Sequence, residues 1–212
     1  MILHLADGVL SIPVVVATTT AAAGILAYSV KGLDEEEIPK ISLMTGAFFV
    51  SSLISIPVGP TTIHPMLGGL LGLVLGKRTP LGIFIGLLLQ AILFQHGGLT
   101  TLGANTLLFS LPALLIYAVF GKRKRISMFL KGALAGGFSI IGGVGLLIGV
   151  LLLTDQRFGE GFFSVVNMIV AGHIPLVIIE GILTGFAVSY LYKVKPGLFS
   201  YKINTGKERV AN

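Results

Sequence analysis

Long apolar segments constrain the fold of this chain more than any other feature of its sequence. Of its 212 residues, 54% are hydrophobic and only 11% are charged, whereas about 25% of the residues in a typical soluble domain are charged. Apolar segments of about 20 residues are long enough to cross a bilayer as helices. We therefore predict an all-α, polytopic integral membrane protein.

Seven apolar segments are predicted to form the transmembrane helices of one bundle. The third is too short to cross about 30 Å of hydrocarbon, so we expect a half-helix or a tilted segment buried in protein. Residues 1–196 are assigned to a single membrane-embedded domain, and residues 197–212 to a cytoplasmic tail. The seven segments are residues 10–30, 41–58, 65–76, 80–95, 104–120, 127–153 and 172–192.

The basic residues predict the orientation of this bundle. Lys and Arg concentrate in the cytoplasmic loops of membrane proteins. With seven spans and the N-terminus outside, all of the 15 Lys and Arg residues except Arg157 fall on the cytoplasmic side. Six spans would divide the basic clusters between the two sides. The N-terminus is therefore predicted to lie outside and the C-terminus inside.

Composition and missing motifs exclude several kinds of chemistry. The chain has no cysteine, which excludes disulfides, thiolate metal sites and cysteine nucleophiles. It has no Gly-x-x-x-x-Gly-Lys phosphate-binding loop, so it is not expected to hydrolyse a nucleotide by itself. We attribute the net charge of +6 to membrane topology and expect no nucleic-acid partner.

All four histidines fall on the predicted outer face. His4, His64, His96 and His173 lie in, or at the border of, an outer segment. Imidazole is a common nitrogen ligand for late transition metals. This grouping predicts a metal site at the outer mouth of the bundle.

Each histidine also has a plainer interpretation. His4 could chelate Ni(II), Cu(II) or Co(II) together with the α-amine and a backbone amide, or lie on a frayed terminus. His64 could be presented by a rigid loop or be bonded to the backbone at a helix start. His96, among glycines, could orient a ligand or support its loop. Asn105 could cap the fifth helix or bond the N-terminal segment.

His173 and Glu180 are seven residues apart and share nearly the same helix face. An ionised carboxylate inside a span costs about 2.5–3.5 kcal/mol. Glu180 is therefore expected to face the bundle interior with a partner. It could act in a site or form a polar lock between helices.

Four sequence blocks together resemble the substrate-binding S component of the energy-coupling-factor transporters for cobalt and nickel. They are residues 4–11, 63–69, 90–105 and 173–181. The resemblance extends over nearly the whole chain up to Pro196. It implies a six-helix S-component core with an added N-terminal helix.

The resemblance also implies roles for individual residues. The N-terminal segment would fill the outer cavity, with His4 and His64 as metal ligands and His96, Asn105 and Asp7 as supporting residues. Members of that family begin Met-His, whereas Met1, Ile2 and Leu3 precede His4 in this sequence. A TTG start codon at position 3 would restore the pattern. The resemblance implies a planar site of four nitrogens, from the starting amine, the next backbone nitrogen and the His4 and His64 side chains. With the longer start, three donors or a weaker site would replace it.

These features predict capture of Co(II) or Ni(II) as a transported substrate, without an organic cofactor. The resemblance implies a transmembrane T component and two cytoplasmic ATPases as partners, in a bacterial or archaeal cell membrane. It leaves room for a small accessory membrane subunit. Ala17, Ala21 and Gly24, at helical spacing, could dock such a partner or only pack helices.

Two alternatives stay open at this point. One is an intramembrane enzyme that uses His173 and Glu180 as acid–base groups. The other is an S component for an organic vitamin, although the chain has no Trp for stacking. The sequence does not choose between cobalt and nickel, because both accept nitrogen donors.

Overall fold

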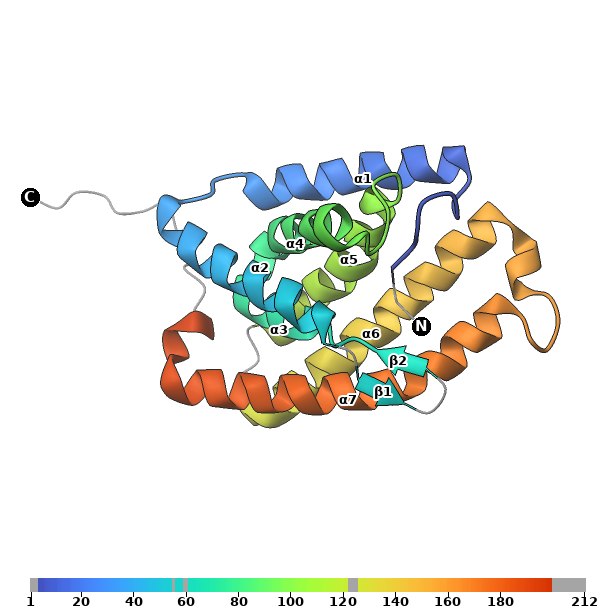
Figure 1. Cartoon of the computed structure of the whole chain (residues 1–212). Coiled ribbons are helices and arrows are strands. Elements are labelled where there is room, and N and C mark those ends of the chain that lie inside the picture. Colours follow the sequence, from blue (N-terminus) through green and yellow to red (C-terminus); the bar gives the residue numbers. More distant parts are fainter. Residues whose placement is uncertain (1–3, 55, 59–60, 122–125, 200–212) are drawn as a thin grey trace, which may run out of the picture.

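The structure is a computed structural model that describes residues 4–54, 56–58, 61–121 and 126–199. Met1 to Leu3, the basic cluster of residues 122–125, and residues 200–212 of the predicted tail lie outside the described residues. The described chain is almost entirely helical, which confirms the predicted fold class (Figure 1). The α-helices are α1 (Ile12–Val30), α2 (Ile38–Leu53), α3 (Gly68–Leu75), α4 (Thr79–Phe94), α5 (Leu102–Phe120), α6 (Met128–Thr154) and α7 (Val165–Val194).

Short 3-10 helices join several of these elements. They are η1 (Glu35–Glu37), η2 (Gly76–Arg78), η3 (Gln156–Gly159) and η4 (Pro196–Phe199). Because η2 follows α3 directly and precedes α4, the stretch Gly68–Phe94 is nearly continuous helix. The predicted boundary between the membrane domain and the tail, at residue 197, lies within η4.

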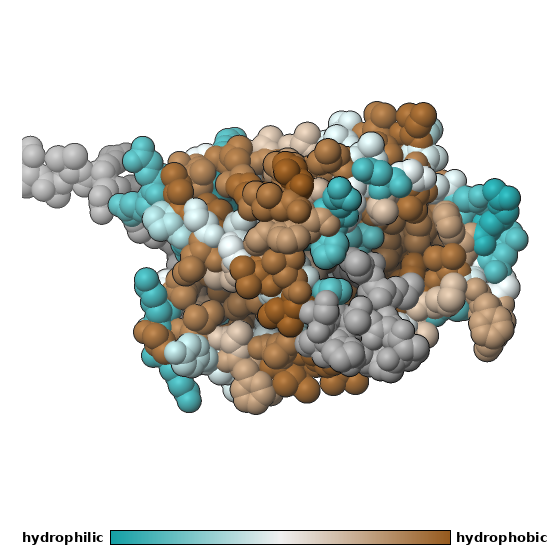
Figure 2. All heavy atoms as spheres, viewed as in Figure 1, coloured by the Kyte–Doolittle hydropathy of each residue, from teal (hydrophilic) through white to brown (hydrophobic). Residues whose placement is uncertain are grey.

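Within the part of the chain that the structure describes, five helical stretches are long and apolar enough to cross a membrane. They are Ile12–Val30, Gly68–Phe94, Leu102–Phe120, Met128–Thr154 and Val165–Val194. Figure 2 shows apolar side chains over much of the visible face, with hydrophilic residues at its left and right ends and a further hydrophilic cluster near its middle. The chain is thus a multi-pass membrane protein, while seven crossings and an outward N-terminus remain predictions.

The predicted second span, residues 41–58, is wrong at its C-terminal end. Helix α2 stops at Leu53, and the chain then forms an antiparallel hairpin of β1 (Ile56–Val58) and β2 (Thr61–Ile63). Ile56 pairs with Ile63 and Val58 with Thr61. Pro57 explains the difference, because proline lacks an amide hydrogen and its ring clashes with the preceding helical turn.

The last helix begins earlier than predicted, at Val165 instead of Gly172. Its cap is Ser164, whose hydroxyl accepts a hydrogen bond from the Asn167 amide at 3.2 Å. Serine is a preferred residue at this position because it satisfies an amide that has no partner within the helix. Together α6 and α7 form the long antiparallel pair drawn in yellow and orange in Figure 1.

Helix α3 is the interior element of the bundle. All eight of its residues are buried, and it packs against α5 and α6. Glycine allows this contact: a Cβ on Gly72 would lie 2.5 Å from the Ala113 carbonyl oxygen of α5, and one on Gly69 would lie 2.6 Å from the Gly136 amide of α6. The short third segment is thus enclosed by protein, one of the two arrangements that its length predicted.

Gly72→Ala is expected to lower the free energy of unfolding by about 1–3 kcal/mol, the usual range for inserting atoms into a well-packed core. Thermal unfolding in detergent measures the effect. Gly145→Ala in α6 is the matched control, because a Cβ there has no atom within 4 Å. Alanine also favours helix over glycine, so the control should be neutral or stabilising. Equal destabilisation of the two variants would contradict the packing argument.

Candidate metal site

The described N-terminal segment lies against the beginning of α5. Asn105 accepts a hydrogen bond from the Leu5 amide at 2.8 Å and donates one to the Leu5 carbonyl oxygen at 3.0 Å. The Thr101 hydroxyl donates to the same oxygen at 2.6 Å. In Figure 1 this dark-blue segment runs from the start of α1 toward the middle of the bundle. Asn105 therefore bonds the segment, the second of its two interpretations.

Asp7 fastens the segment to the loop between α4 and α5. Its carboxylate accepts hydrogen bonds from the Thr100 amide at 2.8 Å, the Thr100 hydroxyl at 2.5 Å and the Leu99 amide at 3.3 Å. These bonds, first of all that from the Thr100 hydroxyl, hold the pKa of Asp7 below its usual range. A Cβ on Gly98 would lie 2.5 Å from the Asp7 amide nitrogen, so only glycine permits this approach.

His4 lies within the bundle mouth with its ring against Phe109, at a centroid separation of 5.2 Å. Among the described residues, neither ring nitrogen has a partner at hydrogen-bonding geometry. Burial, followed by the nearby His96 and His64 charges, lowers the pKa of His4 to about 3, while the Gln90 side chain acts in the opposite direction. The ring is therefore neutral at physiological pH, the state in which an imidazole binds metal.

This pKa predicts an unusual titration of His4 in the metal-free protein. A free histidine gains its proton near pH 6.5, but a pKa lowered to about 3 keeps the His4 ring neutral as the pH falls from 8 to 5. We expect its ring nitrogen chemical shifts to stay constant over that range in a nitrogen NMR titration. An inflection near pH 6.5 would show that the ring is exposed to water and would contradict the buried placement.

His64 lies between β2 and α3. Its Nδ1 is 3.0 Å from the Ser52 carbonyl oxygen at the end of α2. A carbonyl oxygen can only accept, so in the neutral ring Nδ1 carries the proton and Nε2 carries a free lone pair. Metal-binding histidines commonly use such a hydrogen bond to fix ring orientation and tautomer. This hydrogen bond leaves Nε2 as the ring nitrogen that has a lone pair open to a metal.

His96 follows α4 and faces His64, with ring centroids 6.2 Å apart. Its backbone position depends on two left-handed residues, Gln95 at φ 55° and Gly97 at φ 81°. A Cβ on Gly97 would lie 3.7 Å from the Cβ of His4, so this loop also contacts the N-terminal segment. The fold thus brings His4, His64 and His96 together from three separate parts of the chain.

These three rings do not by themselves enclose an ion. Within the described part of the chain, no three His, Cys, Asp or Glu side chains form a group able to hold one metal. A metal bound by His4 and His64 therefore requires further donors. The predicted α-amine donor belongs to residues 1–3, which lie outside the described residues, so its contribution remains a prediction.

His173 and Glu180 do not form an acid–base pair. His173 is buried in α7, and its Nδ1 lies 2.7 Å from the carbonyl oxygen of Ile169 in its own helix. Glu180 is fully buried and accepts a hydrogen bond from the Met66 amide at 3.1 Å. No hydrogen bond or ion pair joins the two side chains in the described structure. Glu180 instead joins α7 to the start of α3.

Sequence reasoning assigned no role to Gln90. This α4 residue is fully buried, and neither atom of its side-chain amide has a hydrogen-bond partner within the described structure. Its side chain is also among the groups that influence the pKa of His4. A polar amide inside an apolar span is the signal that could have identified it, because such residues usually face functional cavities.

The proposed docking residues lie on the outside of the bundle. Ala17, Ala21 and Gly24 of α1 are exposed, whereas Thr18, Ala22 and Ser29 form the buried side of this helix. A Cβ on Gly24 would meet no atom within 4 Å. The stripe therefore does not pack α1 against the described chain, and its role in docking remains a prediction.

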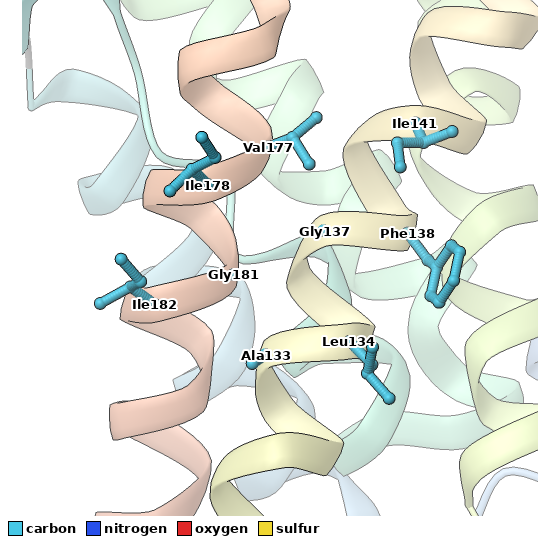
Figure 3. A pocket seen from close by; sticks show the side chains of 9 residues that line it. All are labelled: Ala133, Leu134, Gly137, Phe138, Ile141, Val177, Ile178, Gly181 and Ile182. Carbon is cyan, nitrogen blue, oxygen red and sulfur yellow. The ribbon is translucent and has the colours of Figure 1, made fainter.

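An apolar groove lies between α6 and α7, with a volume of about 320 Å³. Figure 3 shows Val177 and Ile178 of α7 and Phe138 and Ile141 of α6 beside it, with Gly137 between them. Its lining side chains are all hydrocarbon. A groove of this kind offers no side-chain ligand to a metal ion.

The chain is similar over most of its length to known metal transport proteins. The model of the CbiM family, described as the cobalt uptake substrate-specific transmembrane region, matches residues 4–198. A Haemophilus influenzae protein, provisionally named a metal transport protein, is 33% identical over 198 residues, covering 92% of this chain and 95% of that protein. An Archaeoglobus fulgidus protein, provisionally named the fused nickel transport protein NikMN, is 25% identical over 217 residues. The match covers 99% of this chain and 72% of that protein.

A solved structure shares the fold. The crystal structure of a truncated transition metal transporter superposes with a TM-score of 0.76 and 23% sequence identity. The match covers 90% of this chain and 99% of that chain. At this level of identity the likeness concerns the arrangement of the helices.

Proposed function

Because this chain belongs to the CbiM family of cobalt-uptake substrate-specific transmembrane regions, we propose that it captures Co(II) or Ni(II) at the outer face of a cell membrane. Family membership also confirms the resemblance drawn from the sequence. The observation that carries the proposal is the buried, neutral His4 ring, which lies near His64 and His96 and has two nitrogens without partners. Buried polar atoms normally have a hydrogen-bond partner, and a bound metal ion would account for these two nitrogens that have none.

His4 and His64 are the proposed metal ligands, and the other residues support them. Asn105 and Asp7 fix the N-terminal segment through the hydrogen bonds to Leu5, Leu99 and Thr100. His96 packs against His64 and completes the wall of the site. The imidazoles are held before metal arrives, which reduces the entropy lost on binding.

Both cobalt and nickel suit this donor set. The family description names cobalt uptake, and the Archaeoglobus relative is named for nickel transport. Affinity of nitrogen sites rises from Co(II) through Ni(II) to Cu(II). Selectivity within this series therefore has to come from site geometry and metal supply.

Uptake is proposed to require partner proteins. The sequence contains no nucleotide-binding loop, so ATP hydrolysis would belong to two cytoplasmic ATPases coupled through a transmembrane T component. A small accessory membrane subunit is a further proposed partner. The exposed Ala17, Ala21 and Gly24 face of α1 offers close approach to another helix.

The proposed topology has seven spans, with the N-terminus outside a bacterial or archaeal cell membrane. The N-terminal segment, the β1–β2 hairpin and the α6–α7 loop all lie toward the same end of the molecule in Figure 1. The C-terminal end of α1 and η2, which carry Lys31, Lys77 and Arg78, lie toward the other end. This arrangement agrees with basic residues facing the cytoplasm.

The two alternatives receive less support. The family is one of transporter components, and an acid–base pair of His173 and Glu180 is not assembled in the described structure. An organic vitamin would be expected to stack on aromatic side chains, and the sequence contains no Trp.

Equilibrium titration of the purified full-length protein tests the proposal. We expect saturable 1:1 binding of Ni(II) or Co(II) and no comparable binding of Mg(II), because Mg(II) prefers oxygen ligands. The absence of saturable Ni(II) and Co(II) binding would overturn the proposed function.

A further inference from the structure

Glu180 is an acidic residue enclosed at the centre of the bundle. Its side chain is fully buried in α7. One carboxylate oxygen, Oε2, accepts a hydrogen bond from the Met66 amide at 3.1 Å. The other, Oε1, has no hydrogen-bond partner among the described residues. Met66 belongs to the chain that leads from the hairpin into α3. The contact therefore joins two elements that lie 114 positions apart in the sequence.

The contacted backbone has an uncommon conformation. Leu67 precedes α3 and adopts the left-handed region, with φ 51°. A residue with a Cβ rarely occupies this region unless surrounding contacts hold it there. Amides at the start of a helix also lack partners within that helix. The Glu180 carboxylate accepts a hydrogen bond from the Met66 amide, next to Leu67, and so holds the turn in place.

This turn begins at His64. Only Pro65 separates His64 from Met66, and the proline ring restricts φ to a narrow range around −65°. Because this φ is restricted, fewer backbone rotations can absorb a displacement of the Met66 amide before it reaches the His64 backbone. On its other side, the His64 ring is held by the Ser52 carbonyl oxygen at 3.0 Å. The imidazole is thus fixed between α2 and, through Met66, α7.

We propose that Glu180 is a positioning residue for His64: by accepting a hydrogen bond from the Met66 amide, it sets the orientation in which His64 Nε2 meets the incoming metal. This inference rests on the proposed function. Among the described residues, no hydrogen bond or ion pair joins Glu180 to His64 or His4, so its influence is exerted through the backbone of residues 64–66. Supports of this kind commonly change metal affinity by about 10–100-fold when they are removed.

Three substitutions separate the acceptor role from simple space filling. Glu180→Leu keeps the approximate size and removes both acceptor oxygens. Glu180→Gln keeps the length and one oxygen that can accept from Met66. Glu180→Asp keeps the carboxyl group but is one methylene shorter. Thr184→Val is the matched control, because Thr184 is fully buried one turn along α7 and its hydroxyl has no hydrogen-bond partner among the described residues.

The experiment is a Ni(II) titration of each full-length variant, with the ligand-field absorption spectrum recorded at saturation. We expect Glu180→Leu to weaken Ni(II) binding at least about 10-fold and to shift its saturated spectrum toward that of His64→Ala. Glu180→Gln should stay within about threefold of wild type, as should Thr184→Val. Glu180→Asp should fall between Gln and Leu. If Glu180→Leu cannot be purified, the ranking of Asp below Gln carries the test.

Wild-type affinity in Glu180→Leu would overturn the inference, as would weakened binding with an unchanged saturated spectrum, since the latter indicates a general loss of folded protein. Asp binding as well as Gln, or better, would also overturn it. Each of these results leaves wild-type metal binding intact and so leaves the proposed function standing. Failure of the wild type to bind Ni(II) or Co(II) would instead remove the proposed function and this inference with it.

Discussion

His64→Ala is expected to lower the affinity for Ni(II) or Co(II) by at least about 100-fold. Removing a residue that merely supports a ligand typically costs 10–100-fold, and loss of the ligand itself should cost no less. The substitution removes an imidazole whose Nδ1 is bonded to Ser52 and whose Nε2 is available. Isothermal titration or equilibrium dialysis of the purified protein measures the change.

His173→Gln is the matched histidine control for this prediction. His173 is buried in α7 and bonds the Ile169 carbonyl oxygen of its own helix. Its replacement is expected to leave metal affinity within about threefold of wild type, well below the change that removal of a supporting residue causes. An equal loss in both variants would mean that His64 acts through stability rather than ligation. Unchanged binding by His64→Ala would exclude it as a ligand.

Among the substitutions predicted to affect stability, Arg78→Met is expected to lower the free energy of unfolding most, by about 3 kcal/mol. Arg78 lies in η2 with its side chain only 3% exposed, and its guanidinium forms a 2.6 Å ion pair with Glu37. It also donates to the Ser29 and Lys31 carbonyl oxygens, at 2.5 and 3.0 Å. Removing it leaves acceptors at the end of α1 without a donor. Because Glu37 is 36% exposed, water compensates part of the loss.

Thermal or denaturant unfolding in detergent measures the free energy of unfolding of Arg78→Met, with Arg157→Ala as the control. Arg157 also pairs with a carboxylate at 2.6 Å, that of Asp155, but its side chain is 81% exposed. Exposed ion pairs contribute about 0–1 kcal/mol. If the two variants lose the same stability, burial of Arg78 is not the reason for its importance.

Much of the helical fold could be predicted from apolar segments alone. The short third segment was recognisable by length, and the structure encloses it among α5 and α6. Its exact packing depends on Gly69 and Gly72, which meet backbone atoms of distant helices. Such contacts have no local signature. The end of α2 was missed because apolar residues continue past Leu53 into the hairpin.

The sequence predicted which residues gather at the site better than how they are held there. Histidine positions and predicted topology brought His4, His64 and His96 to one end. The hydrogen bonds of Asn105 to Leu5 and of Glu180 to Met66 span 100 and 114 positions, so no local pattern reports them. Arg78 was interpreted only as a topological marker, because net charge does not reveal that a cation is buried.

The most direct test of the metal-capture account is X-ray absorption at the nickel edge on protein loaded with one equivalent of Ni(II). We predict a first shell dominated by nitrogen, with outer-shell scattering from two imidazole rings that falls to one ring in His64→Ala. Nitrogen donors, imidazole among them, are typical ligands of Ni(II). A first shell of oxygen alone, or imidazole scattering that His64→Ala leaves unchanged, would contradict metal capture by His4 and His64.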